Sequence, residues 1–307
     1  MPPEPEHFRH STRPVSVAAI QMACDWNTGN NIATAERLVR EAAGRGAQII
    51  LLPELFETPY FCIEQDARHL KLAHSVEENR AVRHFSEVAR ELGVVLPISF
   101  FERAGPAYFN SVAIIDADGT NLGVYRKSHI PNGPGYQEKN YFSPGDTGFK
   151  VWNTRFARVG VGICWDQWFP ETARAMALLG AEIFLFPTAI GTEPPPALPV
   201  NSRDHWQRTQ QGHAAANLTP LVASNRYGLE RSLQDPQGLY IRFYGSSFIA
   251  DAMGAKLAEA PQEGDAVVTS TFDLEAIAQL RDNWFVFRDR RPDLYGALVS
   301  LDGRRKE

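Results

Sequence analysis

The sequence predicts an α/β protein in which two pseudo-repeated halves with mixed sheets stack as a four-layer α-β-β-α sandwich. The first observation behind this prediction is an internal echo, because residues 46–53 (GAQIILLP) return at residues 180–187 as GAEIFLFP. The second is another echo at nearly the same offset, in which residues 116–119 (DADG) return at residues 251–254 as DAMG. Two echoes at one spacing indicate a duplicated unit, and each unit shows the apolar patterns of a strand, a helix, a strand and further strands.

The first half begins with residues 15–22, whose apolar pattern predicts a strand. Residues 32–43 are predicted to be a helix, because their apolar side chains recur at helical spacing. The side chains that share its buried face are Ala35, Leu38, Val39 and Ala42. Residues 49–52 then form a buried strand that ends at Pro53, which has no N–H to donate. Glu54 is therefore expected at the carboxyl edge of the first sheet.

The second half repeats this order of elements. Residues 158–164 predict a strand, and Pro170 is well suited to the first position of the helix predicted over residues 171–179. Parallel strands joined by helices need cover on the outside of the sheet, so we expect the helices to form the outer layers. Asp118 and Gly119 mark the tip of an antiparallel hairpin, which makes each sheet mixed.

The composition and the net charge of the chain exclude some classes of protein. The chain has 307 residues, of which 44% are hydrophobic and 22% charged, so it can bury a sizeable core. Its net charge of −5 argues against nucleic acid as a partner. No apolar run is long enough to span a bilayer, and residues 1–13 lack the apolar part of a signal peptide, so we expect no membrane partner and a cytoplasmic location.

The three cysteines, Cys24, Cys62 and Cys164, predict reduced thiols rather than a disulfide framework. Cys164 is the candidate nucleophile, because it ends an apolar strand and precedes a polar, aromatic turn into a helix. Such a turn exposes the side chain, directs backbone N–H groups at it, and lets the helix dipole favour the thiolate. The alternative is a buried structural cysteine. Cys24 leads into a plain loop and Cys62 lies in an aromatic stretch, so both give weaker signals.

A thiol with an ordinary pKa of about 8.5 needs a base to become a nucleophile at neutral pH. The histidines offer no convincing partner, although His205 and His213 on a predicted helix leave a papain-like Cys-His pair as an alternative. Glu54 is the better candidate, because it lies near the sheet edge that also bears the cysteine. Lys127 follows the predicted strand 122–126 and would by itself be taken for a surface lysine.

Three segments together resemble the catalytic blocks of the nitrilase, or carbon-nitrogen hydrolase, superfamily. They are residues 53–57 (PELFE), 126–131 (RKSHIP) and 162–166 (GICWD), and they occur in the order and spacing of that superfamily. The resemblance extends from about residue 15 to residue 295. It implies the same four-layer sandwich that the internal echoes predict.

The resemblance also implies roles for individual residues. The Glu-Lys-Cys triad of the superfamily falls on Glu54, Lys127 and Cys164, and its second glutamate falls on Glu138. Glu54 then takes the thiol proton, while Lys127 and the backbone N–H of Trp165 stabilise the developing oxyanion. Glu138 orients Lys127 or assists the attacking water.

Further segments resemble one branch of the superfamily, the N-carbamoylputrescine amidohydrolases of polyamine biosynthesis. They are residues 164–171 (CWDQWFPE), 187–194 (PTAIGTEP) and 204–206 (DHW). The resemblance implies hydrolysis of a carbamoyl amine, with N-carbamoylputrescine giving putrescine, ammonia and carbon dioxide. The alternatives are an N-carbamoyl amino acid or omega-amide hydrolase of the same superfamily and, from another class, a non-catalytic scaffold of the same fold.

A diamine-derived substrate ends in an ammonium group, so a carboxylate is expected to face it. Glu193, in the loop after the predicted strand 183–187, is the candidate, and Tyr60 and Trp165 are further candidates for substrate contacts. A carbamoyl amino acid would instead need a cation such as Arg174 or Arg226.

No cofactor or metal is expected from the motifs. Gly160-Val161-Gly162 begins like a dinucleotide fingerprint, but the third glycine position holds Trp165. No pair of histidines has the spacing typical of a zinc hydrolase, and His69 and His74 are five apart without other plausible ligands.

The expected organisation is a flexible N-terminal arm at residues 1–13, a single catalytic domain over residues 14–295, and a tail at residues 296–307. Residues 284–295 mix aromatic side chains with arginines, which is typical either of a subunit contact or of a segment that returns onto its own domain. We expect a homo-oligomer, a dimer or a multiple of it.

Overall fold

The computed structural model describes residues 12–192 and 201–304. The first half of the chain supplies one set of strands and the helices that cover it. The helices are α1 (Thr28–Gly44) and α2 (Arg80–Leu92). The strands are β1 (Pro14–Gln21), β2 (Ile49–Leu51), β3 (Leu96–Ala104), β4 (Ala107–Ile115) and β5 (Asn121–Arg126), together with β14 (Ala266–Asp273) from the end of the chain. They pair in the orders β14-β1-β2 and β3-β4-β5, and a parallel bridge between Ile49 and Val95 joins the two groups.

The second half forms a six-stranded sheet in the order β13-β12-β9-β8-β7-β6. Its strands are β6 (Val151–Asn153), β7 (Arg158–Val161), β8 (Ile183–Pro187), β9 (Leu221–Ser224), β12 (Phe248–Ala250) and β13 (Lys256–Glu259). The central strands β7, β8 and β9 run parallel, and the outer ones pair antiparallel, so the sheet is mixed as predicted. Helices α3 (Pro170–Leu178) and α4 (Arg203–Asn217) belong to this half, and β10 (Tyr227–Arg231) pairs with β11 (Tyr240–Tyr244) in a separate hairpin.

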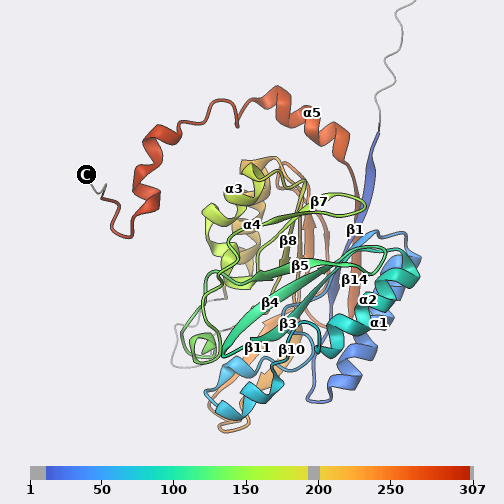
Figure 1. The fold of residues 1–307 in the computed structure, drawn as a ribbon, viewed down its shortest axis with the longest axis vertical. Coiled ribbons are helices and arrows are strands. Elements are labelled where there is room, and N and C mark those ends of the chain that lie inside the picture. Colours follow the sequence, from blue (N-terminus) through green and yellow to red (C-terminus); the bar gives the residue numbers. More distant parts are fainter. Residues whose placement is uncertain (1–11, 193–200, 305–307) are drawn as a thin grey trace, which may run out of the picture.

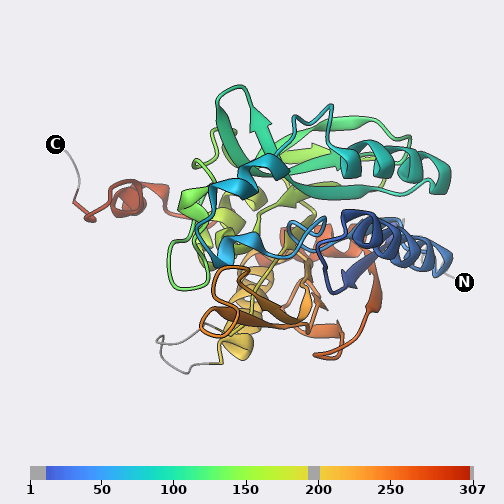
Figure 2. The same cartoon turned by 90° about the horizontal axis from the view of Figure 1, so that it is seen from below.

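Three apolar cores separate the four layers. Side chains of both sheets, such as Val17 and Val159, form the central core. Leu38 of α1 and Phe85 of α2 pack on the outer face of the first sheet, and Met176 of α3 packs on the second. Figure 1 shows α1 and α2 on one side of the strands and α3 and α4 on the other, and Figure 2 gives the view from below. The predicted α-β-β-α sandwich is confirmed.

The two echoes occupy equivalent places in the two halves. Residues 116–119 connect the antiparallel strands β4 and β5, and residues 251–254 connect β12 and β13 in the same way. Gly119 has a φ of 84° and Gly254 a φ of 87°, a left-handed conformation that glycine adopts without strain. The repeat in the sequence is therefore a repeat in the structure.

Several element boundaries differ from the prediction by a residue or more, and the two that bear most on the fold and the site have local reasons. Helix α1 begins at Thr28, earlier than its apolar face indicates, because the side chain of Asn27 accepts hydrogen bonds from the N–H groups of Gly29 and Asn30. Strand β7 ends at Val161, and Cys164 begins a short 3-10 helix, η4 (Cys164–Trp168), rather than ending the strand. The cysteine is thus part of the turn itself.

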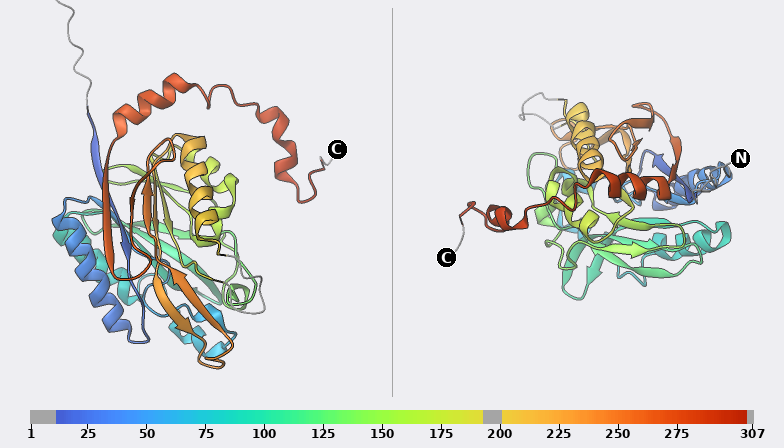
Figure 3. Two further views of the ribbon diagram at one scale, coloured as in Figure 1. Left: turned by 180° about the vertical axis from the view of Figure 1, so that it is seen from behind. Right: turned by 90° about the horizontal axis from the view of Figure 1, so that it is seen from above.

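The C-terminal segment follows β14. Helix α5 (Leu274–Trp284) lies against the end of the sandwich, where Nη2 of Arg281 donates to the carbonyl oxygen of Leu218 (3.1 Å) and to the hydroxyl oxygen of Thr219 (2.8 Å). The 3-10 helix η5 (Pro292–Val299) lies farther from the strands, as Figures 1 and 3 show. At the other end, the N–H of Arg13 donates to Asp273 (3.0 Å), so this residue of the predicted arm is joined to the body. The division into arm, domain and tail stays a prediction. None of the helices in the described residues is long and apolar enough to cross a bilayer.

Candidate active site

Cys164 lies in a sharp turn at the carboxyl end of β7. Its φ of 41° is in the left-handed region that residues with a side chain rarely adopt, so contacts around the turn must hold it there. The residue is only 5% exposed, and its sulfur lies 3.7 Å from the carbonyl oxygen of Ala189. The thiol is therefore fixed at the end of the strand with little access to water.

Asp166 joins this turn to the loop that carries Lys127. Its buried carboxylate accepts hydrogen bonds from the N–H of Ile163 (2.9 Å) and from the hydroxyl of Tyr125 (2.8 Å). It also accepts the N–H of His129 (3.0 Å), whose ring nitrogen Nδ1 lies 2.7 Å away. One carboxylate thus fixes the two segments that bear the thiol and the lysine relative to each other.

Lys127 lies between two carboxylates. Its Nζ donates to Oε1 of Glu54 (2.9 Å) and to both oxygens of Glu138 (2.9 and 2.7 Å). Glu138 begins the 3-10 helix η3 (Glu138–Asn140) and also accepts the hydroxyl of Tyr60 at 2.5 Å. Lys127, Glu54 and Glu138 are all 0% exposed. The structure therefore brings together three of the residues singled out in the sequence.

One carboxylate oxygen in this group has no donor. Oε1 of Glu54 accepts from Lys127 and from Nδ2 of Asn110 (2.7 Å), whereas Oε2 is buried without a hydrogen-bond partner among the described residues. Because a buried carboxylate oxygen is normally paired, the exception needs an explanation. An oxygen left free in this way is suited to accept a proton.

The charges of the group act on one another and on the thiol. Burial alone would lower the pKa of Lys127, but Glu138 and Glu54 raise it well above its ordinary value, so the side chain stays an ammonium. Burial raises the pKa of Glu138 to about 7, against the opposing effect of Lys127. Burial and the charge of Glu54 raise the pKa of Cys164 well above its ordinary value, although Lys127 lowers it. Burial and Glu54 thus shift the pKa of Cys164 in the direction opposite to the one that we expect from the turn alone.

A cavity of about 360 Å³ opens in front of Cys164. Its described lining is mostly apolar and aromatic and includes Trp165, Trp168 and Tyr136, and its polar members are Asn132, Ser202 and His205. The rings of Trp165 and Trp168 lie 6.2 Å apart between centroids, and Trp165 is 38% exposed. Among the described lining residues there is no Lys, Arg, Asp or Glu.

The three residues that are proposed to contact the substrate lie in different parts of the chain and of the structure. Glu193 lies outside the described residues, and Ala189 and Ile190 of the same loop line the cavity. Trp165 lines it as well, whereas Tyr60 is fully buried with its hydroxyl on Glu138. These contacts stay predictions.

The cations considered for a carbamoyl amino acid do not line this cavity. Arg226 is fully buried and paired with Glu230, and Arg174 donates to the carbonyl oxygen of Ala216. Of the two histidines considered, His205 lines the cavity, while Nε2 of His213 lies 2.8 Å from the backbone oxygen of Gln167.

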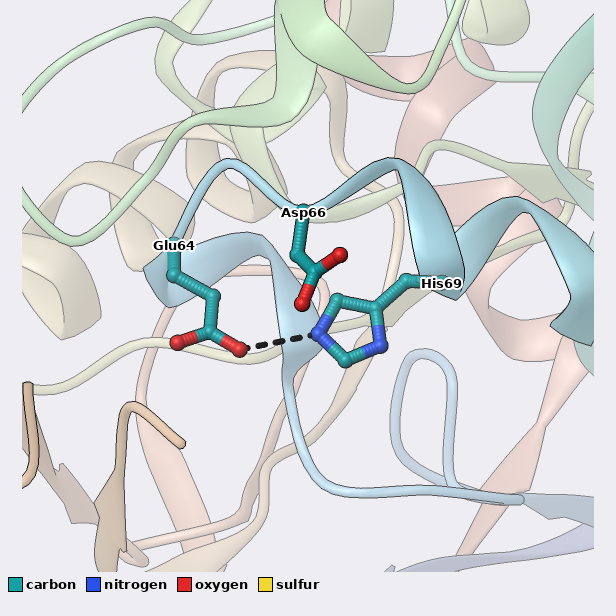
Figure 4. Close-up of side chains that lie close together, drawn as sticks. All are labelled: Glu64, Asp66 and His69. Atoms are coloured by element: carbon teal, nitrogen blue, oxygen red, sulfur yellow. Dashed lines mark hydrogen bonds and ion pairs between the residues drawn. The ribbon is translucent and has the colours of Figure 1, made fainter. Parts of the chain in front are cut away.

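A separate cluster has the composition of a metal site. Glu64, Asp66 and His69 place one possible ligand atom each within 4.8 Å of one another (Figure 4). Nε2 of His69 lies 2.9 Å from Glu64 Oε1, and the second oxygen of Glu64 accepts the N–H of Gln234 (3.0 Å). Asp66 accepts the side chain and the N–H of Arg68. Hydrogen bonds within the chain account for this arrangement, which ties the loop around residue 64 to the loop that follows β10.

Three comparisons place the chain among known proteins. A family model described as carbon-nitrogen hydrolase matches residues 16–282. The chain belongs to the carbon-nitrogen hydrolase family. The N-carbamoylputrescine amidase of Arabidopsis thaliana is 56% identical over 95% of this chain and 97% of that protein. The citrullinase of Francisella tularensis is 53% identical over 93% of this chain and 98% of that protein.

Solved structures agree with this family. The crystal structure of a carbon-nitrogen hydrolase from Helicobacter pylori has a TM-score of 0.88 to this chain at 37% identity. The likeness covers 94% of this chain and 99% of that one. The fold inferred from the repeat and the family inferred from the three blocks therefore coincide.

Proposed function

We propose that this carbon-nitrogen hydrolase is a cysteine-dependent amidohydrolase that converts N-carbamoylputrescine to putrescine, ammonia and carbon dioxide. The observation that supports the chemistry most directly is the buried group of Glu54, Lys127 and Glu138, whose charges act on the thiol of Cys164, which lines the cavity. The substrate is supported by the identity of 56% to the Arabidopsis amidase over nearly the whole of both chains.

The reaction starts with proton transfer. Cys164 keeps its proton at rest, so Glu54 takes it, through its unpaired Oε2, as the sulfur attacks the carbamoyl carbon. The negative charge that develops on the carbonyl oxygen is stabilised by the ammonium of Lys127 and by the backbone N–H of Trp165. Glu138 keeps Lys127 charged and in place.

The same carboxyl group completes the cycle. Protonated Glu54 gives its proton to the departing nitrogen, and the C–N bond breaks to leave an S-carbamoyl group, a thiocarbamate, on Cys164. Glu54, again a carboxylate, then takes a proton from the water that attacks this thiocarbamate. The sulfur leaves and regains a proton, and the resulting carbamate decomposes, so that the net products are the amine, ammonia and carbon dioxide.

The cavity favours an amine over an amino acid as the far end of the substrate. Its described lining offers aromatic faces and no arginine or lysine to pair with a carboxylate. Aromatic rings attract ammonium groups through their π faces, and Glu193 would add a carboxylate. A carbamoyl amino acid is the second candidate, because the citrullinase of Francisella tularensis is 53% identical to this chain.

We also propose that the protein is a cytoplasmic homo-oligomer. Large apolar side chains of the C-terminal segment, including Trp284, Leu294, Leu298 and Leu301, are exposed on α5, η5 and the residues that follow. An apolar surface of this kind is typical of a subunit interface. Light scattering on a chromatography column is expected to give a mass above 34.2 kDa, and the variant Leu294→Ser/Leu298→Ser is expected to shift it toward the monomer.

The function is tested by ammonia release from a panel of N-carbamoylputrescine, N-carbamoyl amino acids and omega-amides. We expect the highest kcat/KM for N-carbamoylputrescine and no turnover by Cys164→Ala. Preference for a carbamoyl amino acid would refute the amine assignment, and preference for an omega-amide would refute the carbamoyl assignment. The absence of turnover on the whole panel by the unmodified protein would favour the non-catalytic scaffold.

A further inference from the structure

A buried ion pair outside the catalytic group lies next to the loop that carries Glu54. Arg226 follows β9 and is 0% exposed, and its Nη1 lies 2.8 Å from Oε1 of Glu230 in β10. Removing two charges from water is costly, so a buried pair persists where it makes several further hydrogen bonds. The other hydrogen bonds of this pair show which segment of the backbone it holds in place.

Arg226 and Glu230 both bind the backbone of residues 54–60. Nη2 of Arg226 donates to the carbonyl oxygens of Glu54 (2.7 Å) and Leu55 (3.0 Å). Its Nη1 donates to the carbonyl oxygen of Thr58 (3.2 Å), and Oε2 of Glu230 accepts the N–H of Tyr60. The pair therefore forms hydrogen bonds to the backbone of this loop at its start, in its middle and at its end.

The loop needs such support. Leu55 has a φ of 48°, a conformation that a leucine adopts only when its surroundings impose it. Its N–H donates to the hydroxyl oxygen of Ser99 (2.9 Å), while Arg226 binds its carbonyl group. Without these contacts the backbone would relax toward a commoner conformation and turn the side chain of Glu54 away from its present direction.

The two ends of the loop carry groups of the proposed catalytic site. Glu54 is the proposed proton carrier, and Tyr60 donates its hydroxyl to the Glu138 carboxylate that holds Lys127. A shift of the loop would therefore move the proton carrier and loosen the support of the lysine together. We propose that the Arg226–Glu230 pair is a positioning device for the catalytic carboxylates, an inference that rests on the proposed function of Glu54.

The geometry also explains why an arginine stands here. Its planar guanidinium presents donors in fixed directions and reaches three carbonyl oxygens and a carboxylate at once, which the single ammonium of a lysine does not. Arg226 is fully buried and is not among the described residues that line the cavity, so in this proposal it acts on the position of the loop rather than on the substrate.

The experiment compares Glu230→Gln and Glu230→Asp with Glu36→Gln as the control. Glu36 forms an ion pair with Arg40 at the same i,i+4 spacing, but on α1 and away from the site. The measurements are kcat and KM for a carbamoyl amine and a carbamoyl amino acid, together with urea denaturation to establish that each variant is folded under the assay conditions. Glu230→Asp keeps the charge beside Arg226 while its shorter side chain cannot span both Arg226 and the N–H of Tyr60.

We expect kcat per folded molecule to fall roughly 100-fold in Glu230→Gln, by the same factor for both substrates, with KM within about threefold, because a misplacement near 1 Å has an effect of this size. Glu230→Asp is expected to behave in the same way, and it serves as the test should Glu230→Gln not fold. Glu36→Gln is expected to keep the unmodified kcat.

Two results would overturn the inference. An unchanged kcat in folded Glu230→Gln and Glu230→Asp would make the pair purely structural, and a rise of KM for the carbamoyl amino acid alone would make Arg226 a substrate contact. Failure of the proposed function looks different, because the unmodified protein would then turn over no member of the panel or would prefer a member other than N-carbamoylputrescine.

Discussion

Replacing Tyr60 by phenylalanine is expected to move the acid side of the pH profile. The hydroxyl of Tyr60 donates to Glu138 at 2.5 Å inside a fully buried site, and it stabilises the ionised form of that carboxyl group. The proposed mechanism needs this form, because ionised Glu138 holds Lys127. Since burial raises the pKa of Glu138 to about 7, kcat of the unmodified enzyme is expected to fall below about pH 7.

The size of the effect follows from the hydrogen bond. A buried hydrogen bond to a charged group contributes about 1.5–3 kcal/mol. One pKa unit corresponds to about 1.4 kcal/mol, so its loss raises the pKa of Glu138 by about one to two units. The sign is fixed, because removing a donor from the ionised form favours the protonated one. The midpoint of the acid limb in Tyr60→Phe is therefore expected at about pH 8 to 9.

The assay is kcat as a function of pH between 5 and 10, with Tyr141→Phe as the matched control. The hydroxyl of Tyr141 also bonds inside the protein, to the N–H of Asp66 (2.8 Å) and the carbonyl oxygen of Glu64 (2.6 Å), and not to Glu138. We expect the control to lower stability without moving the acid limb. An acid limb that stays in place in Tyr60→Phe would refute the assignment of this limb to Glu138.

Three further substitutions test the group around the thiol. Asp166→Asn removes a carboxylate that accepts several buried donors, so kcat is expected to fall at least about 100-fold and the free energy of unfolding by about 2–4 kcal/mol, measured by assay and urea denaturation. Lys127→Met leaves the buried carboxylates unpaired and is expected to cost about 3–5 kcal/mol of stability at pH 8, and less at pH 5.5, where Glu138 is protonated. Gly162→Ala places a Cβ 2.6 Å from a ring carbon of Phe186. The free energy of unfolding, measured by urea denaturation, is therefore expected to fall by about 1–3 kcal/mol.

For each of these three substitutions, one result would contradict the expectation. Full activity of Asp166→Asn would mean that the turn around the nucleophile keeps its shape without the carboxylate. Equal destabilisation of Lys127→Met at both pH values would show that Glu138 does not gain a proton in this range. An unchanged stability of Gly162→Ala would show that Phe186 moves aside freely.

The sequence predicted the layers because they depend on local patterns. The buried stripe of α1, the short buried strand before Pro53 and the DADG hairpin each follow from residues close together in the chain, and the structure confirms them, although β2 ends at Leu51. Glu54, Lys127 and Cys164 are predicted site residues because they lie in the three motif blocks, and Glu138 because it matches the second glutamate of the superfamily, although Lys127 alone would be taken for a surface residue. The start of α1 was missed because an apolar stripe marks the buried face and gives no information on the cap.

The residues that hold the candidate active site in place give little signal in the sequence. Arg226 binds a carbonyl group 172 residues earlier in the chain, and Asn110 binds Glu54 across 56 residues, so no local spacing reveals either contact. Asp166 lay inside a recognised block, yet its role depends on Tyr125 and His129, which only the fold brings near. The direction of the pKa shift of Cys164 was missed because it depends on burial and on the charge of Glu54, and neither follows from the position of the cysteine in a turn.

The complete enclosure of Glu54, Lys127 and Glu138 has a consequence for the working enzyme. Mobile ions screen charges that face solvent over a distance of about 8 Å at physiological ionic strength, but they do not enter a site without exposed surface. Chloride and potassium are therefore expected to leave the chemical step unchanged and to act only on the approach of the proposed cationic substrate to the mouth of the cavity. The enzyme should accordingly keep a constant kcat across the range of salt concentrations that a cell experiences.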